Sequence, residues 1–136
     1  MTSPARGRLV DWRAALDGAA VAVLVTLPPT VAVQLFKGDD LEGQESNLWV
    51  VPVVAMLAGF FLAGRRAARR RPEAPLVHGA AAAALAIGAL AALTVVRRLV
   101  AGDGIGAPLV VTMILLAQVT VSVGVLGGYT VGRSRR

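Results

Sequence analysis

The stretch LWVVPVVAMLAGFFLAG at residues 48–64 is followed at once by RRAARRR at residues 65–71. The first stretch has no charged side chain and is long enough to cross a bilayer, which takes about 17–25 residues of α-helix. A lone strand would leave its backbone groups unpaired in lipid, so a spanning segment must be helical. The pattern therefore predicts a transmembrane helix that ends at a cluster of arginines.

Three more apolar runs have similar lengths, and short connections join all four. The four predicted helices span about residues 14–36, 48–64, 76–96 and 108–131. No connection is long enough for a folded domain outside the membrane. We therefore predict an all-α polytopic membrane protein with four transmembrane helices in a bundle, forming a single membrane domain over residues 1–136.

The composition supports this class and argues against others. Hydrophobic residues make up 56% of the chain and charged residues 16%, against about 25% charged in soluble domains. A small soluble fold cannot bury that much apolar surface. Without cysteine, disulfides and thiol catalysis are excluded. The net charge of +6 comes from arginines at the ends of apolar runs, which favours membrane anchoring over nucleic-acid binding.

The distribution of Lys and Arg predicts the orientation. With the N-terminus in the cytoplasm, eleven basic residues lie inside and only Lys37, Arg97 and Arg98 lie outside. The first apolar run is longer than the 7–15 residues of a signal-peptide core, so we expect it to be retained. The Ala-, Gly-, Val- and Arg-rich composition suggests a bacterial source. We expect a multi-pass protein of the bacterial cytoplasmic membrane with both termini cytoplasmic.

The two halves of the chain share short patterns. DGAA at residues 17–20 matches HGAA at residues 78–81, and GFFLAGR at 59–65 matches GGYTVGR at 127–133. Each hairpin would start and finish on the cytoplasmic side, so a duplication would give two tandem hairpins in the same orientation. The alternative is chance similarity between Ala- and Gly-rich helices that end in arginine.

Small residues recur every four positions and predict close helix packing. Gly124, Gly128 and Gly132 share one face of the fourth helix, and Gly59 lies in a similar stripe of the second. We favour packing within the chain, with a homo-oligomer as the alternative. Pro28 and Pro29 predict a kink in the first helix, because proline removes a backbone donor and clashes with the preceding turn. Such a kink is a common structural feature of membrane helices. The alternative is that it acts as a hinge or lines a substrate path.

Three polar side chains inside the apolar runs are candidate functional residues. Asp17 and His78 each lie about one turn inside the cytoplasmic end of a helix, and ionisable groups in membrane segments are often functional. If their helices adjoin, the two side chains would share a proton; the alternative is ordinary solvation at the headgroup level. Gln118 lies near the centre of the fourth helix, where an amide usually forms an interhelical hydrogen bond.

The basic cluster after residue 64 predicts contact with anionic lipid headgroups, at about 1 kcal/mol per residue near the surface. Its members are Arg65, Arg66, Arg69, Arg70 and Arg71. The single histidine argues against a His-rich metal site. No serine–histidine–acid set, phosphate-binding loop or dinucleotide fingerprint is recognisable. We therefore expect no catalytic residue, cofactor or metal, and no nucleic-acid partner.

One local pattern resembles a known family. The stretch GFFLAGRRA at residues 59–67, followed by His78-Gly79, resembles the uncharacterised YrzE-like family of small four-helix bacterial membrane proteins. The resemblance implies the length of the chain, its four-helix topology and its location in a bacterial membrane, and it implies no known activity, substrate or catalytic residue. Taken together, the sequence predicts a non-enzymatic structural or accessory subunit that binds a membrane-protein partner or itself. The alternative is a small oligomeric transporter or channel.

Overall fold

The computed structural model describes residues 10–36 and 50–134. In this part of the chain the secondary structure is entirely α-helical. The helices are α1 (Trp12–Phe36), α2 (Val50–Arg70), α3 (Pro75–Ala101) and α4 (Ala107–Arg133). Each is long and apolar enough to cross a membrane. The prediction of an all-α protein with four membrane-spanning helices is confirmed.

Two helix ends differ from the sequence prediction by more than two residues. The second helix was expected to end at Gly64, but α2 continues to Arg70. Ala67 and Ala68 in the added turns are fully buried, and their packing keeps the chain helical. The third helix was expected to end at residue 96, but α3 continues to Ala101. There Gly102 adopts a left-handed conformation with φ 78°, which ends the helix.

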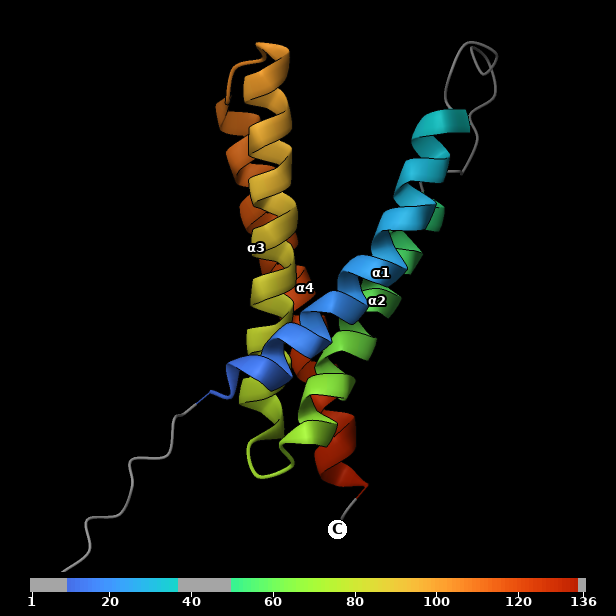
Figure 1. Cartoon of the computed structure of the whole chain (residues 1–136), viewed down its shortest axis with the longest axis vertical. Helices are drawn as coiled ribbons and strands as arrows, with labels where there is room; N and C mark the ends of the chain where they lie inside the picture. Colours follow the sequence, from blue (N-terminus) through green and yellow to red (C-terminus); the bar gives the residue numbers. More distant parts are fainter. Residues whose placement is uncertain (1–9, 37–49, 135–136) are drawn as a thin grey trace, which may run out of the picture.

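The helices form two hairpins, α1–α2 and α3–α4, that meet at one end and separate toward the other (Figure 1). Where they meet, α2 packs on α4 and α1 packs on α3. Both hairpins begin and end at the meeting end, as tandem repeats of one orientation would. We call it the basic end, because Arg65, Arg66, Arg69, Arg70 and Arg71 lie there. The duplication itself stays a prediction.

The buried core lies entirely in the half of the bundle near the basic end. It consists mainly of alanines, with Ile87 and the completely buried Phe60 as the large side chains of the main cluster. We call the parts of the four helices that lie farther from the basic end their open halves. They comprise residues 27–36, 50–58, 88–101 and 107–119, and no residue there whose burial is described is buried. Small side chains let backbones approach closely, and valine and leucine dominate the exposed surface of the open halves.

The predicted glycine face of α4 packs inside the chain. A Cβ added to Gly124 would lie 2.5 Å from the Cβ of Ala83 on α3 and 2.9 Å from the carbonyl oxygen of Gly79. A Cβ on Gly128 would meet the backbone of Pro75, and one on Gly132 would lie 3.3 Å from the Cγ of Pro75. The stripe is therefore covered by α3.

Other glycines make contacts just as close. A Cβ on Gly64 of α2 would overlap the carbonyl oxygen of Gly124, and one on Gly127 would overlap that of Phe61. At Gly59, which the sequence singled out, a Cβ would lie 2.9 Å from the hydroxyl of Thr26 on α1. Glycines at the α1–α2, α2–α4 and α3–α4 contacts thus let the helices meet at backbone distance.

The α1 helix continues through Pro28 and Pro29. The hydroxyl of Thr30 donates to the carbonyl oxygen of Thr26 at 2.8 Å. This bond does not serve the carbonyl groups four residues before the prolines, which lose their amide partners. The hydroxyl of Thr26 is buried against α2 and has no hydrogen-bond partner among the described residues.

Candidate functional site

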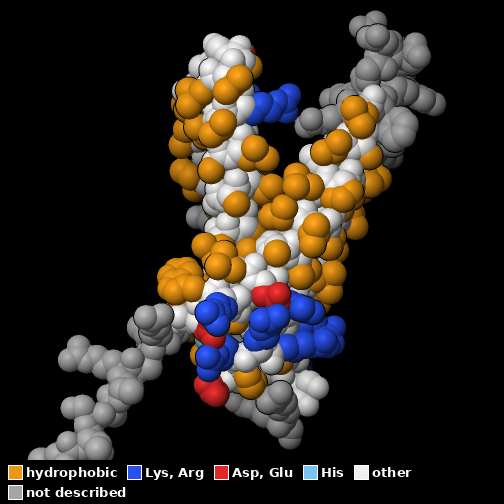
Figure 2. Space-filling model, viewed as in Figure 1, with side chains coloured by type: hydrophobic (Ala, Val, Ile, Leu, Met, Phe, Trp, Pro, Cys, Tyr) orange, Lys and Arg blue, Asp and Glu red, His pale blue; other side chains and the backbone are white. Residues whose placement is uncertain are grey.

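Most of the charged side chains visible in Figure 2 gather at the basic end, with one further basic group near the opposite end, and apolar side chains are spread over the surface between them. Asp17 of α1 contacts two arginines of α2. Its Oδ2 accepts a hydrogen bond from Nε of Arg66 at 2.8 Å and forms an ion pair with Nε of Arg70 at 3.0 Å. Arg66 and Arg70 are four residues apart and share one face of the helix. A single half-buried carboxylate therefore joins α1 to two successive turns of α2.

A second carboxylate, Asp11, both begins α1 and binds the connection between α2 and α3. Its Oδ1 accepts from the backbone amides of Arg13 at 3.0 Å and Ala14 at 3.3 Å, as in an N-cap. Its Oδ2 accepts from the guanidinium of Arg71 at 2.7 Å. The Arg71 hydrogen bond, helped by the amide bonds, lowers the pKa of the Asp11 carboxyl. The sequence analysis missed Asp11, although an aspartate directly before an apolar run is a typical helix-start signal.

His78 joins α3 to the start of α1. Its side chain is only 5% exposed. Nε2 accepts from the backbone amide of Asp11 at 3.0 Å, and Nδ1 lies 2.9 Å from the carbonyl oxygen of Ala74. Because a carbonyl oxygen only accepts, this pattern assigns the hydrogen to Nδ1 and leaves Nε2 as the acceptor, as in neutral imidazole. His78 therefore satisfies a backbone amide of another helix.

The hypothesis that Asp17 and His78 share a proton does not match these bonds. Both residues are described, and no hydrogen bond joins them. Asp17 is held by two guanidinium groups, which remain charged at any physiological pH. His78 has both ring nitrogens in hydrogen bonds with backbone groups. Each residue makes a structural link, and these links are separate.

The predicted arginine cluster divides into two groups. Arg66, Arg70 and Arg71 bind Asp11 or Asp17. The remaining two, Arg65 and Arg69, lie on a neighbouring column of α2 and face the end of α4. With Thr130, Val131 and Ser134 they line a pocket of about 380 Å³. The sequence analysis placed these arginines after the end of the second helix, so it could not separate the two groups. The separation follows from the helical conformation of residues 65–70.

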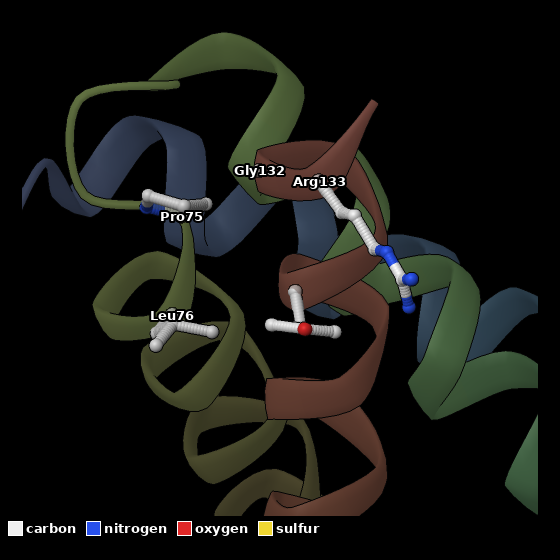
Figure 3. A pocket seen from close by; sticks show the side chains of 5 residues that line it. Pro75, Leu76, Gly132 and Arg133 are labelled. Atoms are coloured by element: carbon white, nitrogen blue, oxygen red, sulfur yellow. The ribbon is translucent and has the colours of Figure 1, made fainter. Parts of the chain in front are cut away.

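A smaller pocket of about 210 Å³ lies between the start of α3 and the end of α4 (Figure 3). Its lining is Pro75, Leu76, Tyr129, Gly132 and Arg133. Gly132 has no side chain to fill the space beside Pro75, and the Arg133 side chain extends away from Pro75 and Leu76. The pocket has an apolar lining without convergent polar groups, so it does not resemble a catalytic site.

Gln118 lies at an exposed position of α4, beside Ser122 on a surface depression. No hydrogen bond of its amide to another described residue is present, so the interhelical bond expected from the sequence is not formed within the described chain. The Ser122 hydroxyl donates to the backbone carbonyl of Gln118 at 2.8 Å. Thr112 and the buried Thr120 likewise bond to carbonyl groups of α4 itself.

Within residues 10–36 and 50–134, no group of three or more potential metal ligands comes together. Comparisons with protein-family models, curated proteins and solved structures found no match for this chain. The resemblance to the YrzE-like family therefore stays a prediction.

Proposed function

We propose that this small multi-pass membrane protein is a non-enzymatic structural or accessory subunit that assembles with another membrane protein through its open halves. The observation that carries the proposal is the uneven packing of the bundle. The hairpins are held together by glycine and alanine contacts near the basic end, and they separate beyond it (Figure 1).

Packing forces explain why this shape favours a partner. Helices in lipid associate through van der Waals contact and interhelical hydrogen bonds, since lipid tails are as apolar as leucine. Next to the core, Met56, Leu90, Leu116 and Ala117 of the open halves still pack against it. Farther along, the two hairpins separate, and no residue of the open halves whose burial is described is buried (Figure 1). An apolar helix of another protein would restore van der Waals contact along that length. A partner helix with a polar group would also satisfy Gln118, whose amide is exposed on α4.

Three ionisable groups at the basic end support a non-enzymatic role. Asp11, Asp17 and His78 are each engaged in a link between elements of the chain. A catalytic acid or base needs a free position beside its substrate. These three groups use their hydrogen-bonding atoms to hold the fold.

Photo-crosslinking of the full chain in native membranes tests this proposal. A photoreactive residue at Val96 of α3, in the open half, should give a discrete adduct with another membrane protein. The matched position is Leu76, which is exposed on the same helix near the basic end and should give lipid adducts. Lipid adducts alone at both positions would contradict the proposal. So would recovery of the chain without a companion after gentle detergent extraction.

A small oligomeric transporter or channel is the second candidate. It is favoured by the V shape, which is closed at the basic end and open at the other (Figure 1). The links of Asp17 and His78 would then close the path on one side. The double variant Asp17→Asn/His78→Gln tests this candidate. Unchanged solute flux and growth in cells that contain the variant would count against it.

The orientation is also part of the proposal. We propose that the basic end lies in the cytoplasm of a bacterial cell, because basic residues near transmembrane helices stay on that side. A fluorescent reporter that folds only in the cytoplasm, fused after Arg136, should be bright, and an alkaline phosphatase fusion at the same site should be inactive. The reverse pattern would overturn the orientation.

A further inference from the structure

The pocket between the last turns of α2 and α4 combines the groups that bind phosphate. Two arginines, Arg65 and Arg69, and two residues with hydroxyl groups, Thr130 and Ser134, line it together with Val131. Its volume of about 380 Å³ falls within the roughly 300–1,000 Å³ usual for ligand pockets. We infer that this pocket binds the phosphate of an anionic phospholipid headgroup, and that it is a built site rather than part of a diffuse positive surface.

The charge of Arg65 and Arg69 is available to a ligand. In the described part of the chain, Asp11 and Asp17 bind the other three arginines of the cluster. No ion pair connects Arg65 or Arg69 with any described carboxylate. Guanidinium groups donate through a planar fork that matches phosphate oxygens in pairs. Two such forks on successive turns of one helix face can hold one phosphate from two directions.

The partial negative charges at the C-termini of α2 and α4 repel an anion, but the positive charges of Arg65 and Arg69 are larger. A helix C-terminus carries roughly −0.5 elementary charge, so two ends carry about −1. Arg65 and Arg69 together carry +2. The Thr130 hydroxyl now donates to the carbonyl oxygen of Gly127 at 2.7 Å. It can exchange that acceptor for a phosphate oxygen without breaking a backbone bond of the helix.

The position of the pocket favours a lipid over a soluble phosphate. On α2, Arg65 is the first charged residue after the apolar run from Val50 to Gly64. On α4, Arg133 is the first charged residue after the run from Ala107. Both helices thus leave the hydrocarbon at the level of the pocket. Basic pockets between transmembrane helices at this level are known to receive anionic headgroups.

Lipid titration of the full-length protein tests the inference. Native mass spectrometry in a neutral detergent would measure binding of phosphatidylglycerol, with phosphatidylcholine as the neutral comparison. We expect phosphatidylglycerol to bind more tightly, and Arg65→Gln/Arg69→Gln to weaken its binding about thirtyfold. The matched control is Arg66→Gln/Arg70→Gln, with the same charge change on the same helix one position along. It should weaken binding less than about threefold.

Equal losses in the two double variants would overturn the inference, because they would show a diffuse electrostatic effect. Should the control variant fail to fold after losing the Asp17 links, Thr130→Val/Ser134→Ala decides instead. This variant keeps the net charge and removes only the pocket hydroxyls. A built site predicts weaker phosphatidylglycerol binding by about threefold or more, whereas a diffuse positive surface predicts no change.

Inorganic phosphate distinguishes the lipid from a soluble ligand. We expect millimolar phosphate alone to leave the thermal unfolding midpoint unchanged and to displace phosphatidylglycerol only weakly. A phosphate-dependent rise in the midpoint that disappears in Arg65→Gln/Arg69→Gln would show that the pocket serves a soluble anion. That result would overturn the assignment to lipid.

Discussion

The contact between Gly64 of α2 and Gly124 of α4 gives a direct test of how the bundle is held together. In Gly64→Ala, the new Cβ would overlap the carbonyl oxygen of Gly124. It would also lie 2.7 Å from the carbonyl carbon and 2.9 Å from the Cα of Gly124. All three are backbone atoms, which cannot move aside by a change of rotamer. We therefore expect α2 and α4 to separate.

The size of the effect follows from these distances. Ordinary van der Waals contact begins at 3.4 Å, so the carbonyl carbon must retreat by at least the difference from 2.7 Å, about 0.7 Å, and the overlapped carbonyl oxygen must retreat farther. Overpacking of this kind costs about 1–3 kcal/mol. A shift of rigid helices also loosens neighbouring contacts, such as that of Gly127 with Phe61. We expect a loss of about 2–3 kcal/mol, near the upper end of that range.

The matched control is Gly88→Ala on α3, where an added Cβ meets nothing within 4 Å. Both substitutions replace glycine by alanine inside a helix, so any gain in helix propensity is shared. Reversible unfolding in bicelles gives the two free energies of unfolding, and circular dichroism checks that the helix content is retained. If Gly64→Ala were as stable as Gly88→Ala, the close approach of α2 and α4 would be refuted.

Three further predictions concern the links at the basic end. Asp17→Asn should lower the thermal unfolding midpoint. Arg66→Gln should lower the midpoint less in the Asp17→Asn variant than in the unchanged protein, and equal effects in the two backgrounds would argue against the ion pair. His78→Phe should cost about 1–3 kcal/mol, because buried backbone groups lose a partner, and the Asp11 amide should exchange its hydrogen faster; unchanged exchange would contradict the hydrogen bond. Because the pKa of Asp11 is lowered in the folded protein, the stability from its carboxylate is complete above its ordinary value of 3.8 and is lost as the pH falls through the folded value. Thermal midpoints measured from about pH 6 to pH 3 should therefore fall less steeply for Asp11→Asn than for the unchanged protein.

The membrane class was predictable from the sequence because it depends on local properties alone. Run length, apolar composition and the absence of charge decide whether a segment can span a bilayer. These properties identified all four helices, and the glycine spacing identified one packing face of α4. The ends of α2 and α3 were misjudged, because charged residues were taken as helix boundaries. Buried Ala67 and Ala68 show that the packing of neighbouring helices extended α2 past Arg65 and Arg66.

The pairing of side chains depended on the tertiary structure. From the sequence, Asp17 and His78 looked like partners because they occupy matching positions in two similar halves. The structure instead assigns Asp17 to Arg66 and Arg70, and His78 to the backbone of Asp11. Such pairings depend on how each helix is rotated about its own axis. Successive side chains point about 100° apart around that axis, so a small rotation changes which residues face a neighbouring helix. No local pattern specifies that rotation.

The sequence by itself thus determined what is set by the interaction of each segment with lipid: four helices, apolar along their length and basic at one end. Only the tertiary structure decided which arginines are bound by carboxylates and which line a pocket, and where the two hairpins separate. The physical reason is that insertion into lipid is a property of one segment. Helix packing depends on the close fit of two surfaces, where a single Cβ added at Gly64 would overlap the backbone of Gly124.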